Sequence, residues 1–271
     1  MPLSPGDLRE VKTIAHGGMA LLTLARTPDG KEVVKRELHR KYMLRPRTHM
    51  RFLRGLRIRE MLSPHDHIVR PLTRGYHGLL PYEILEYVPG HNLHEWILRR
   101  REKIESCALT ILKDVAEAVA FMHEKHILHL DVKAENVLID TGGDSGQLNA
   151  KLTDFDLSRN VRGEHNHLHA GTESHMAPEQ LAGGDVSYSN DIFAFGVMAY
   201  YLVTGRMPFA AYSLKDVRRR QMSKSYKVTE PTKINPDLAP KLNWIIMRCL
   251  EKDRSQRFPH TAYLVQELSR V

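Results

Sequence analysis

The chain has 271 residues, of which 42% are hydrophobic and 27% are charged, and its formal net charge is +8. This composition supplies enough apolar side chains for one large domain or for two lobes around a cleft, and it excludes an intrinsically disordered chain. The longest apolar run, from Ile192 to Val203, is too short to cross a bilayer and indicates a buried helix. The first residues lack the basic and apolar regions of a cleaved secretion signal, so none is expected.

The two cysteines, Cys107 and Cys249, both lie in apolar helical patterns. Such cysteines are typical of packed thiols in a reducing compartment. We therefore expect a cytoplasmic protein. Delivery into a host cell as an effector is an alternative that the sequence leaves open.

The first third of the chain predicts a small antiparallel sheet. Between residues 10 and 36, short apolar stretches alternate with turn signals, and Asp29-Gly30 between two of them indicates a hairpin. Residues 48–62 then show the apolar spacing of a helix. Strand-like stretches at 68–72 and 83–88 complete this part of the chain.

After Pro89-Gly90 the pattern becomes helical. Apolar side chains recur at helical spacing from residue 105 to residue 125. Further helices are expected at 190–204, 214–222, 239–251 and 261–270. The sequence therefore predicts an α+β fold, in which a strand-rich first part is followed by a helix-rich remainder.

The strongest chemical signal is HLDVKAEN at residues 129–136. An aspartate can accept a hydroxyl proton, a lysine two residues later can neutralise a phosphoryl group in transfer, and an asparagine five residues later offers an oxygen to Mg²⁺. This stretch resembles the catalytic loop of protein kinases. The resemblance assigns Asp131, Lys133 and Asn136 to catalysis, and it assigns Asn136 to the metal as well.

Further motifs match the same family in its order along the chain. KLTDFDL at 151–157 resembles the Asp-Phe-Gly segment, which implies that Asp154 binds the Mg²⁺ (or Mn²⁺) that bridges the phosphates of ATP. GTESHMAPE at 171–179 resembles the end of the activation segment. Asp191 matches the aspartate that anchors the catalytic loop, and Arg257 matches the arginine that pairs with the last glutamate of the activation segment.

The N-terminal motifs are weaker. IAHGGMALL at 14–22 resembles the Gly-rich loop of the family, although Ala15 and Ala20 replace two of its glycines. The glycines that remain allow a close backbone approach to phosphates. Lys35, at the end of EVVK, matches the strand lysine that contacts the α- and β-phosphates.

The segment LEYV at 85–88 resembles the hinge, where the backbone of Glu86 and Val88 would hydrogen-bond adenine. Leu85 would be the gatekeeper. The resemblance therefore implies an ATP site formed by Ile14, Gly17, Gly18, Leu22, Val33, Lys35, Leu85, Glu86, Val88 and Leu138.

Two departures concern charge around the expected ATP site. The helix glutamate that should pair with Lys35 is expected near Gly55, whereas Glu60, the only carboxylate of that helix, lies more than a turn later. Asp156 replaces the glycine of Asp-Phe-Gly and adds a negative charge near the phosphates. It would either hinder ATP or help to hold a cation.

A third departure is Leu130, which replaces the arginine that receives an activation-segment phosphate in the family. Leucine cannot bind a phosphate. We therefore expect activity that does not need phosphorylation of Ser158, Thr172 or Ser174.

Basic residues are concentrated between residues 35 and 59, where Glu37 and ten Lys or Arg residues occur. The simplest interpretation is a solvated face; the alternative is a docking site for an acidic partner. Nucleic acid is not expected, because aromatic side chains do not alternate with the basic residues as a row of stacking platforms would require.

Together these motifs resemble the catalytic domain of a bacterial-style, Hanks-type Ser/Thr protein kinase, over roughly residues 8–271. The resemblance implies a bilobal kinase fold that occupies the whole chain, 1–271. Residues 8–88 would form the ATP-binding N-lobe, a small antiparallel sheet with one helix. Residues 89–271 would form the larger, mainly α-helical C-lobe for catalysis and substrate binding.

The function that this resemblance implies is transfer of the γ-phosphate of ATP to Ser or Thr hydroxyls of protein substrates. Lys133 and Thr172 match the Ser/Thr subclass. The alternative is a pseudokinase, a scaffold that binds nucleotide or partner proteins without efficient transfer, as the changes at Ala15, Gly55 and Asp156 suggest. A small-molecule phosphotransferase is disfavoured, because such enzymes typically lack the Ala-Pro-Glu segment.

Overall fold

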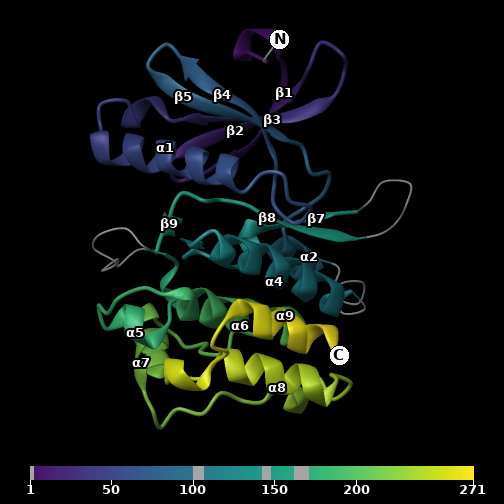
Figure 1. Cartoon of the computed structure of the whole chain (residues 1–271), viewed down its shortest axis with the longest axis vertical. Coiled ribbons are helices and arrows are strands. Elements are labelled where there is room, and N and C mark those ends of the chain that lie inside the picture. Colours follow the sequence, from purple (N-terminus) through teal and green to yellow (C-terminus); the bar gives the residue numbers. More distant parts are fainter. Residues whose placement is uncertain (1–2, 100–106, 142–147, 162–170) are drawn as a thin grey trace.

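The computed structural model describes residues 3–99, 107–141, 148–161 and 171–271. The strands of the first part and one long helix lie together at one end of the molecule, and the remaining long helices lie at the other end (Figure 1). The predicted bilobal α+β fold is therefore confirmed.

The N-lobe contains a five-stranded antiparallel sheet in the order β1-β2-β3-β5-β4. Its strands are Arg9–His16 (β1), Ala20–Arg26 (β2), Glu32–Leu38 (β3), Pro71–His77 (β4) and Leu80–Glu86 (β5). The predicted hairpin at Asp29-Gly30 joins β2 to β3, and Gly30 has a φ of 85°, which glycine adopts without strain. The strand predicted at 68–72 is wrong in its start, because β4 begins only at Pro71.

Helix α1, Pro46–Met61, is the long helix of the N-lobe and lies within two residues of its predicted bounds. Its buried side chains Phe52 and Leu56 pack against Ala20 and Leu38 of the sheet. These apolar positions, four residues apart, lie on one face of the helix and fix that face on the sheet. Gly55, which is next to Leu56 in the helix, lies close to Asp156 in the loop between β8 and β9.

The C-lobe is built around α6, Tyr188–Thr204, which is buried along nearly its whole length. Helices α4 (Ala108–Glu124), α8 (Pro240–Cys249) and α9 (Thr261–Ser269) pack with it in a single apolar core (Figure 1). The shorter helices are α2 (Leu93–Arg99), α5 (Pro178–Leu181) and α7 (Leu214–Met222). Across the described part of the chain, no helix is long and apolar enough to cross a membrane.

Four short strands lie between the N-lobe sheet and these helices. Val137–Asp140 (β7) pairs with Asn149–Leu152 (β8), and Ile127–Leu128 (β6) pairs with Arg159–Asn160 (β9). The loop between β6 and β7 carries the HLDVKAEN segment, and the loop between β8 and β9 carries the Asp-Phe-Asp segment. The two strand pairs therefore bring both segments to the boundary between the lobes (Figure 1).

Candidate active site

Asp191 on α6 anchors the loop that carries the catalytic candidates. Its buried carboxylate accepts hydrogen bonds from the backbone N–H groups of His129, at 2.8 Å, and Leu130, at 2.7 Å, and from the His123 ring at 2.9 Å. Burial alone would raise the pKa of Asp191, but the hydrogen bond from His123 and the neighbouring imidazoles hold the pKa below its ordinary value. The anchored loop turns at Leu130, where φ is 65°.

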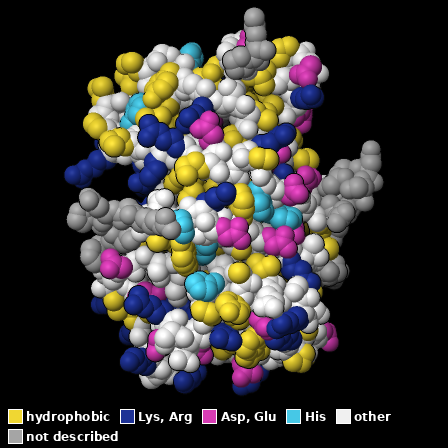
Figure 2. Space-filling view, viewed as in Figure 1, with side chains coloured by type: hydrophobic (Ala, Val, Ile, Leu, Met, Phe, Trp, Pro, Cys, Tyr) yellow, Lys and Arg dark blue, Asp and Glu magenta, His cyan; other side chains and the backbone are white. Residues whose placement is uncertain are grey.

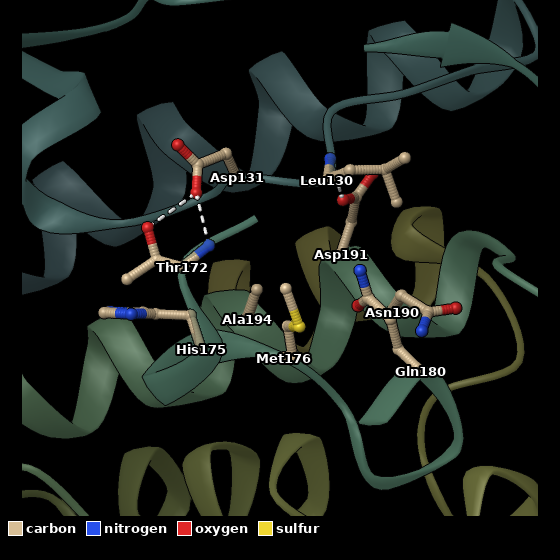
Figure 3. A pocket seen from close by; sticks show the side chains of 9 residues that line it. All are labelled: Leu130, Asp131, Thr172, His175, Met176, Gln180, Asn190, Asp191 and Ala194. Carbon is tan, nitrogen blue, oxygen red and sulfur yellow. Dashed lines mark hydrogen bonds between the residues drawn. The ribbon is translucent and has the colours of Figure 1, made fainter. Parts of the chain in front are cut away.

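Asp131 lies at the centre of a hydrogen-bonded group (Figure 3). Its Oδ1 accepts from the backbone N–H of Thr172 at 3.1 Å and from the Thr172 hydroxyl at 2.9 Å. Its Oδ2 lies 2.8 Å from Lys133 Nζ and 3.0 Å from Asn136 Nδ2. Burial would raise the pKa of Asp131, but Lys133 and Thr172 outweigh this effect and lower it, so the group is a carboxylate at neutral pH.

Lys133 and Thr172 are also hydrogen-bonded to each other. Lys133 Nζ donates to the Thr172 hydroxyl at 2.7 Å, and the same hydroxyl donates to Asp131. The lysine cation, the threonine hydroxyl and the aspartate therefore form a continuous chain of charge-assisted hydrogen bonds. The arrangement holds the carboxylate and the cation side by side in a partly buried place.

Asn136 and Asp154 both line the cleft between the lobes. The Asn136 amide nitrogen donates to the carbonyl of Asp131 at 2.9 Å, so its amide oxygen is left as an acceptor. Asp154 has a φ of 64° in the loop after β8. A carboxylate and an amide oxygen are the hard oxygen donors that Mg²⁺ prefers, with water and phosphate oxygens as further ligands. The residues present therefore fit a Mg²⁺ (or Mn²⁺) ion, which Asn136 and Asp154 would hold.

The cleft has a volume of about 860 Å³, which is enough for a nucleotide. Its inner wall is apolar, with Val34, Val69, Leu85 and Val88 in one buried cluster. Such a wall suits a flat heteroaromatic ring. The predicted ATP-site residues that line the cleft are Ile14, Gly17, Gly18, Leu22, Leu85, Glu86, Val88 and Leu138.

The placement predicted for Val33 and Lys35 is wrong by one residue. Side chains on a strand alternate between its two faces, and on β3 the cleft side carries Val34 and Arg36. Val33 instead packs in a cluster on the other face of the sheet. Lys35 also points away from the cleft, and its Nζ lies 2.5 Å from Glu10 Oε1.

The backbone of Glu86 has an N–H group and a carbonyl oxygen, and the N–H group already has a partner within the protein. Its N–H donates to the carbonyl of Arg70 at 3.0 Å, so this donor is used within the protein. Its side chain accepts from the Arg70 N–H and from Lys151 Nζ, each at 2.9 Å. In a hydrogen bond with a nucleotide, the carbonyl oxygen of Glu86 would therefore be the acceptor.

Sequence reasoning missed a buried group of four charged residues at the back of the cleft. We call Arg36, Arg59, Glu83 and Asp156 the charge cluster. Glu83 lies 2.9 Å from Arg36 and 3.2 Å from Arg59, and Asp156 lies 2.5 Å from Arg36. Arg59 also lies over the Phe155 ring, 4.9 Å from its centroid. The signals in the sequence were two arginines in the basic run and the unusual aspartate.

The segment at residues 171–179 is held in place at both ends. Gly171 has a φ of 132°, and a side chain there would come within 2.8 Å of the Leu130 carbonyl oxygen, so only glycine fits. At the other end Arg257 donates to both carboxylate oxygens of Glu179, at 2.7 and 2.9 Å. A cavity of about 10 Å³, the room of one water molecule, lies between this segment and α6 (Figure 3).

The basic stretch between residues 35 and 59 does not form one continuous face. Lys35, Arg36 and Arg59 are buried, while Arg51 and Arg54 donate to the backbone carbonyl of Asp156. Lys and Arg side chains nevertheless gather around α1 on the surface in Figure 2. The exposed members of the stretch are Arg40, Lys41, Arg45, Arg47 and Arg57.

Comparison with known proteins is consistent with this geometry. A family model described as protein kinase domain matches residues 8–268. The chain is 28% identical to serine/threonine-protein kinase PrkC of Bacillus subtilis (strain 168) over 93% of its length, and 28% identical to serine/threonine-protein kinase pkn2 of Myxococcus xanthus over 95%. It is 26% identical to the probable serine/threonine-protein kinase PkwA of Thermomonospora curvata over 99%.

The chain spans 38%, 31% and 35% of the lengths of these three relatives, so the likeness covers about a third of each of them. Within this chain, however, the family model covers both lobes, the cleft and the catalytic group. The chain belongs to the protein kinase domain family.

Proposed function

We propose that the cleft binds ATP with Mg²⁺ and that the chain transfers the γ-phosphate to Ser or Thr hydroxyls of protein substrates. One observation carries this proposal. The Asp131 carboxylate lies within 3.0 Å of Lys133, Thr172 and Asn136, and Asn136 also faces the cleft together with Asp154. A general base, a cation and two metal ligands are thus gathered at one edge of a nucleotide-sized cleft.

In this reaction Asp131 would orient the acceptor hydroxyl and take up its proton as the hydroxyl oxygen attacks the γ-phosphorus, while the bond from that phosphorus to the oxygen shared with the β-phosphate breaks and ADP leaves. Lys133 offsets the negative charge on the phosphoryl group in transfer. Asn136 and Asp154 would hold Mg²⁺, and the ion would supply positive charge that offsets the charge of the phosphates. Positioning and electrostatics lower the barrier, because no covalent intermediate is required.

Two observations support Ser and Thr as acceptors. Lys133 and Thr172, the residues that resemble the Ser/Thr subclass, are in direct contact at 2.7 Å beside Asp131. The relatives described above carry the name serine/threonine-protein kinase. The expected location in the cytoplasm belongs to this proposal as well, and it rests on the thiol pattern of Cys107 and Cys249.

We also propose that activity needs no phosphate on the activation segment. Leu130 is buried and apolar and offers no donor to a phosphate. Ser158 is fully buried, and its hydroxyl donates to the carbonyl of His129 at 3.2 Å. The Thr172 hydroxyl is engaged by Asp131 and Lys133. Protein treated with a phosphatase should therefore retain its full initial rate.

A docking role for the basic surface around α1 remains a proposal that is separate from catalysis. The exposed cations Arg40, Lys41, Arg45 and Arg47 support an acidic partner or an acidic substrate segment. Reversal of two of these charges, in Arg45→Glu with Arg47→Glu, should weaken turnover of an acidic protein substrate. It should leave turnover of a neutral peptide unchanged.

The test of the main proposal is an incubation of the protein with Mg²⁺, ATP and a generic basic protein, followed by mass spectrometry of the products. New phosphate on Ser or Thr is expected, and Asp131→Asn should lower the rate by about a hundredfold or more. Nucleotide binding without transfer would overturn the proposal in favour of a pseudokinase.

A further inference from the structure

The charged residue that faces the cleft from β3 is an arginine. Arg36 lines the cleft together with Asn136 and Asp154, whereas its neighbour Lys35 is on the opposite face of the strand with Glu10. The strand position that the family resemblance assigned to Lys35 is thus occupied in space by Arg36. The difference matters, because a guanidinium presents five N–H donors in a planar fork, and an ammonium is a point charge.

Arg36 is held by two carboxylates that do not come from helix α1. Its Nη1 donates to Glu83 on β5 at 2.9 Å, and its Nη2 donates to Asp156 at 2.5 Å. Glu60, the carboxylate of α1, is exposed and pairs instead with Arg74 at 2.7 Å. Arg36 is therefore paired with one carboxylate from β5 and one from the loop after β8, whereas Glu60 of α1 has another partner.

Gly55 on α1 makes room for this arrangement. A Cβ atom built at Gly55 would lie 2.8 Å from Asp156 Oδ1 and 3.4 Å from the Asp156 Cα. A larger side chain at residue 55 and the Asp156 carboxylate therefore cannot occupy this space together. The two departures from the family pattern, Gly55 and Asp156, are therefore linked: the glycine leaves the space that the aspartate side chain occupies.

We propose that Arg36 is the phosphate-binding cation of this cleft and that Asp156, on the Asp-Phe-Asp segment, is the residue that positions it in place of a helix glutamate. The proposal deepens the function proposed above and rests on it. Two of the five donors of Arg36 are used by Glu83 and Asp156, which leaves donors for phosphate oxygens. Arginine can bind phosphate through two such parallel hydrogen bonds.

The charge balance of the cluster explains why a second carboxylate is needed. Arg59 is 2% exposed and places a second cation beside Glu83, so Glu83 alone would face both arginines. Asp156 brings the cluster to two cations and two anions. Buried charges that lack a partner are strongly unfavourable, and a glycine at residue 156 would leave Arg36 and Arg59 to share the single carboxylate of Glu83.

The first experiment compares two neighbouring residues of β3. Arg36→Met and Lys35→Met each remove one positive charge, from opposite faces of the same strand. Arg36→Met should weaken binding of Mg²⁺-ATP, measured by calorimetry, by roughly tenfold to a hundredfold, because a charge-assisted hydrogen bond is lost. Lys35→Met should bind within about twofold of the parent protein. Equal losses, or a larger loss for Lys35→Met, would overturn the assignment of Arg36.

The second experiment moves the carboxylate back to the helix. Asp156→Gly should raise the KM for ATP roughly tenfold, whereas Gly55→Glu with Asp156→Gly should restore it, because the glutamate then reaches Arg36 from α1. Gly55→Glu alone should lower the melting temperature, since the new side chain meets Asp156. Asp156→Asn keeps the shape without the charge, and it should repeat the effect of Asp156→Gly if the glycine variant folds poorly.

The outcomes separate this inference from the proposed function. Nucleotide affinity is measured without turnover, so the comparison of Arg36 with Lys35 remains decisive even in a protein that transfers no phosphate. Failure of transfer with the expected affinities would overturn the kinase activity and retain the role of Arg36. An unchanged KM for ATP in Asp156→Gly and Asp156→Asn would overturn the role of Asp156. A KM that stays raised in the double variant would also overturn it.

Discussion

Arg257 and Glu179 form a two-point ion pair in which both carboxylate oxygens are bound, at 2.7 and 2.9 Å. The Arg257 side chain has no exposed surface, whereas that of Glu179 is 18% exposed. Arg257 also donates to the backbone carbonyls of Ser189 and Glu251, at 3.0 and 2.7 Å. One buried guanidinium thus joins the end of the activation segment to the start of α6 and to the loop after α8.

Removal of this guanidinium should be costly. Arg257→Met leaves the Glu179 carboxylate without its partner, so we expect the free energy of unfolding to fall by about 3–5 kcal/mol. Urea denaturation checks this value. Arg270→Met is the control, because Arg270 pairs with Glu267 at the surface with 56% of its side chain exposed, where about 1 kcal/mol or less is expected. Similar losses in the two variants would contradict the prediction.

His175 should make the protein sensitive to acid. Burial lowers the pKa of its imidazole to about 4, although Glu135 and Asp131 oppose this effect, while Lys133 adds to it. The folded protein keeps the ring neutral, whereas the unfolded chain takes up a proton below its ordinary pKa of 6.5. The contribution of His175 to the free energy of unfolding is therefore at its largest above pH 6.5. It falls by about 3 kcal/mol as the pH approaches 4.

Urea denaturation across this pH range tests the assignment. His175→Phe keeps a ring of similar size without a titrating group, so its unfolding free energy should decline less steeply between pH 6.5 and 4. His260→Gln, at an exposed position, should decline in parallel with the parent protein. Parallel curves for all three proteins would assign the acid sensitivity to other groups.

The Thr172 hydroxyl should matter for turnover more than for stability. It accepts from Lys133 and donates to Asp131, so Thr172→Val breaks the chain of hydrogen bonds that orients both groups. We expect kcat/KM to fall by roughly tenfold to a hundredfold. Thr172→Ser keeps the hydroxyl and should retain most of the activity. Steady-state kinetics with a Ser peptide would contradict this role if the two variants were equally active.

The core of the C-lobe should not tolerate a methyl group at Gly196. A Cβ at this position of α6 would lie 2.6 Å from the Cys249 Cβ, and 3.2 Å from the Cys249 carbonyl carbon. Gly196→Ala should therefore lower the unfolding free energy by about 1–3 kcal/mol, although alanine favours a helix. Gly18→Ala, where the new Cβ meets nothing within 4 Å, is the control for thermal melts. A more stable Gly196→Ala protein would show that the two helices can separate.

Much of the fold could be predicted because its signals are local. The helix predicted at 214–222 matches α7 at both ends, and that at 261–270 differs from α9 by one residue at its end. In both, apolar spacing and a polar residue at the start mark the boundary within a few residues of sequence. The start of strand β4 was predicted too early because Ile68 and Val69 are apolar. These two residues are buried next to Leu152 of β8, outside the N-lobe sheet, and do not pair with β5.

The sequence does not show which side chains of β3 point into the cleft. Val33 and Val34 are both apolar, Lys35 and Arg36 are both basic, and all four are buried, so no alternation distinguishes the two sides. Only the pairing of β3 with β2 and β5, and the packing of α1 on one side of the sheet, decides which cation faces the cleft. A shift of one residue moves every side chain of a strand to the other face.

The sequence by itself determined that Asp131, Lys133 and Asn136 lie together, because they are close along the chain and a short loop must bring them into contact. It also determined the family and the order of the two lobes. Only the tertiary structure decided that Arg36 meets Asp156, 120 residues later, across the space left by Gly55. The physical reason is that a buried ion pair depends on three-dimensional distance and on room for both side chains, and neither is encoded by local spacing.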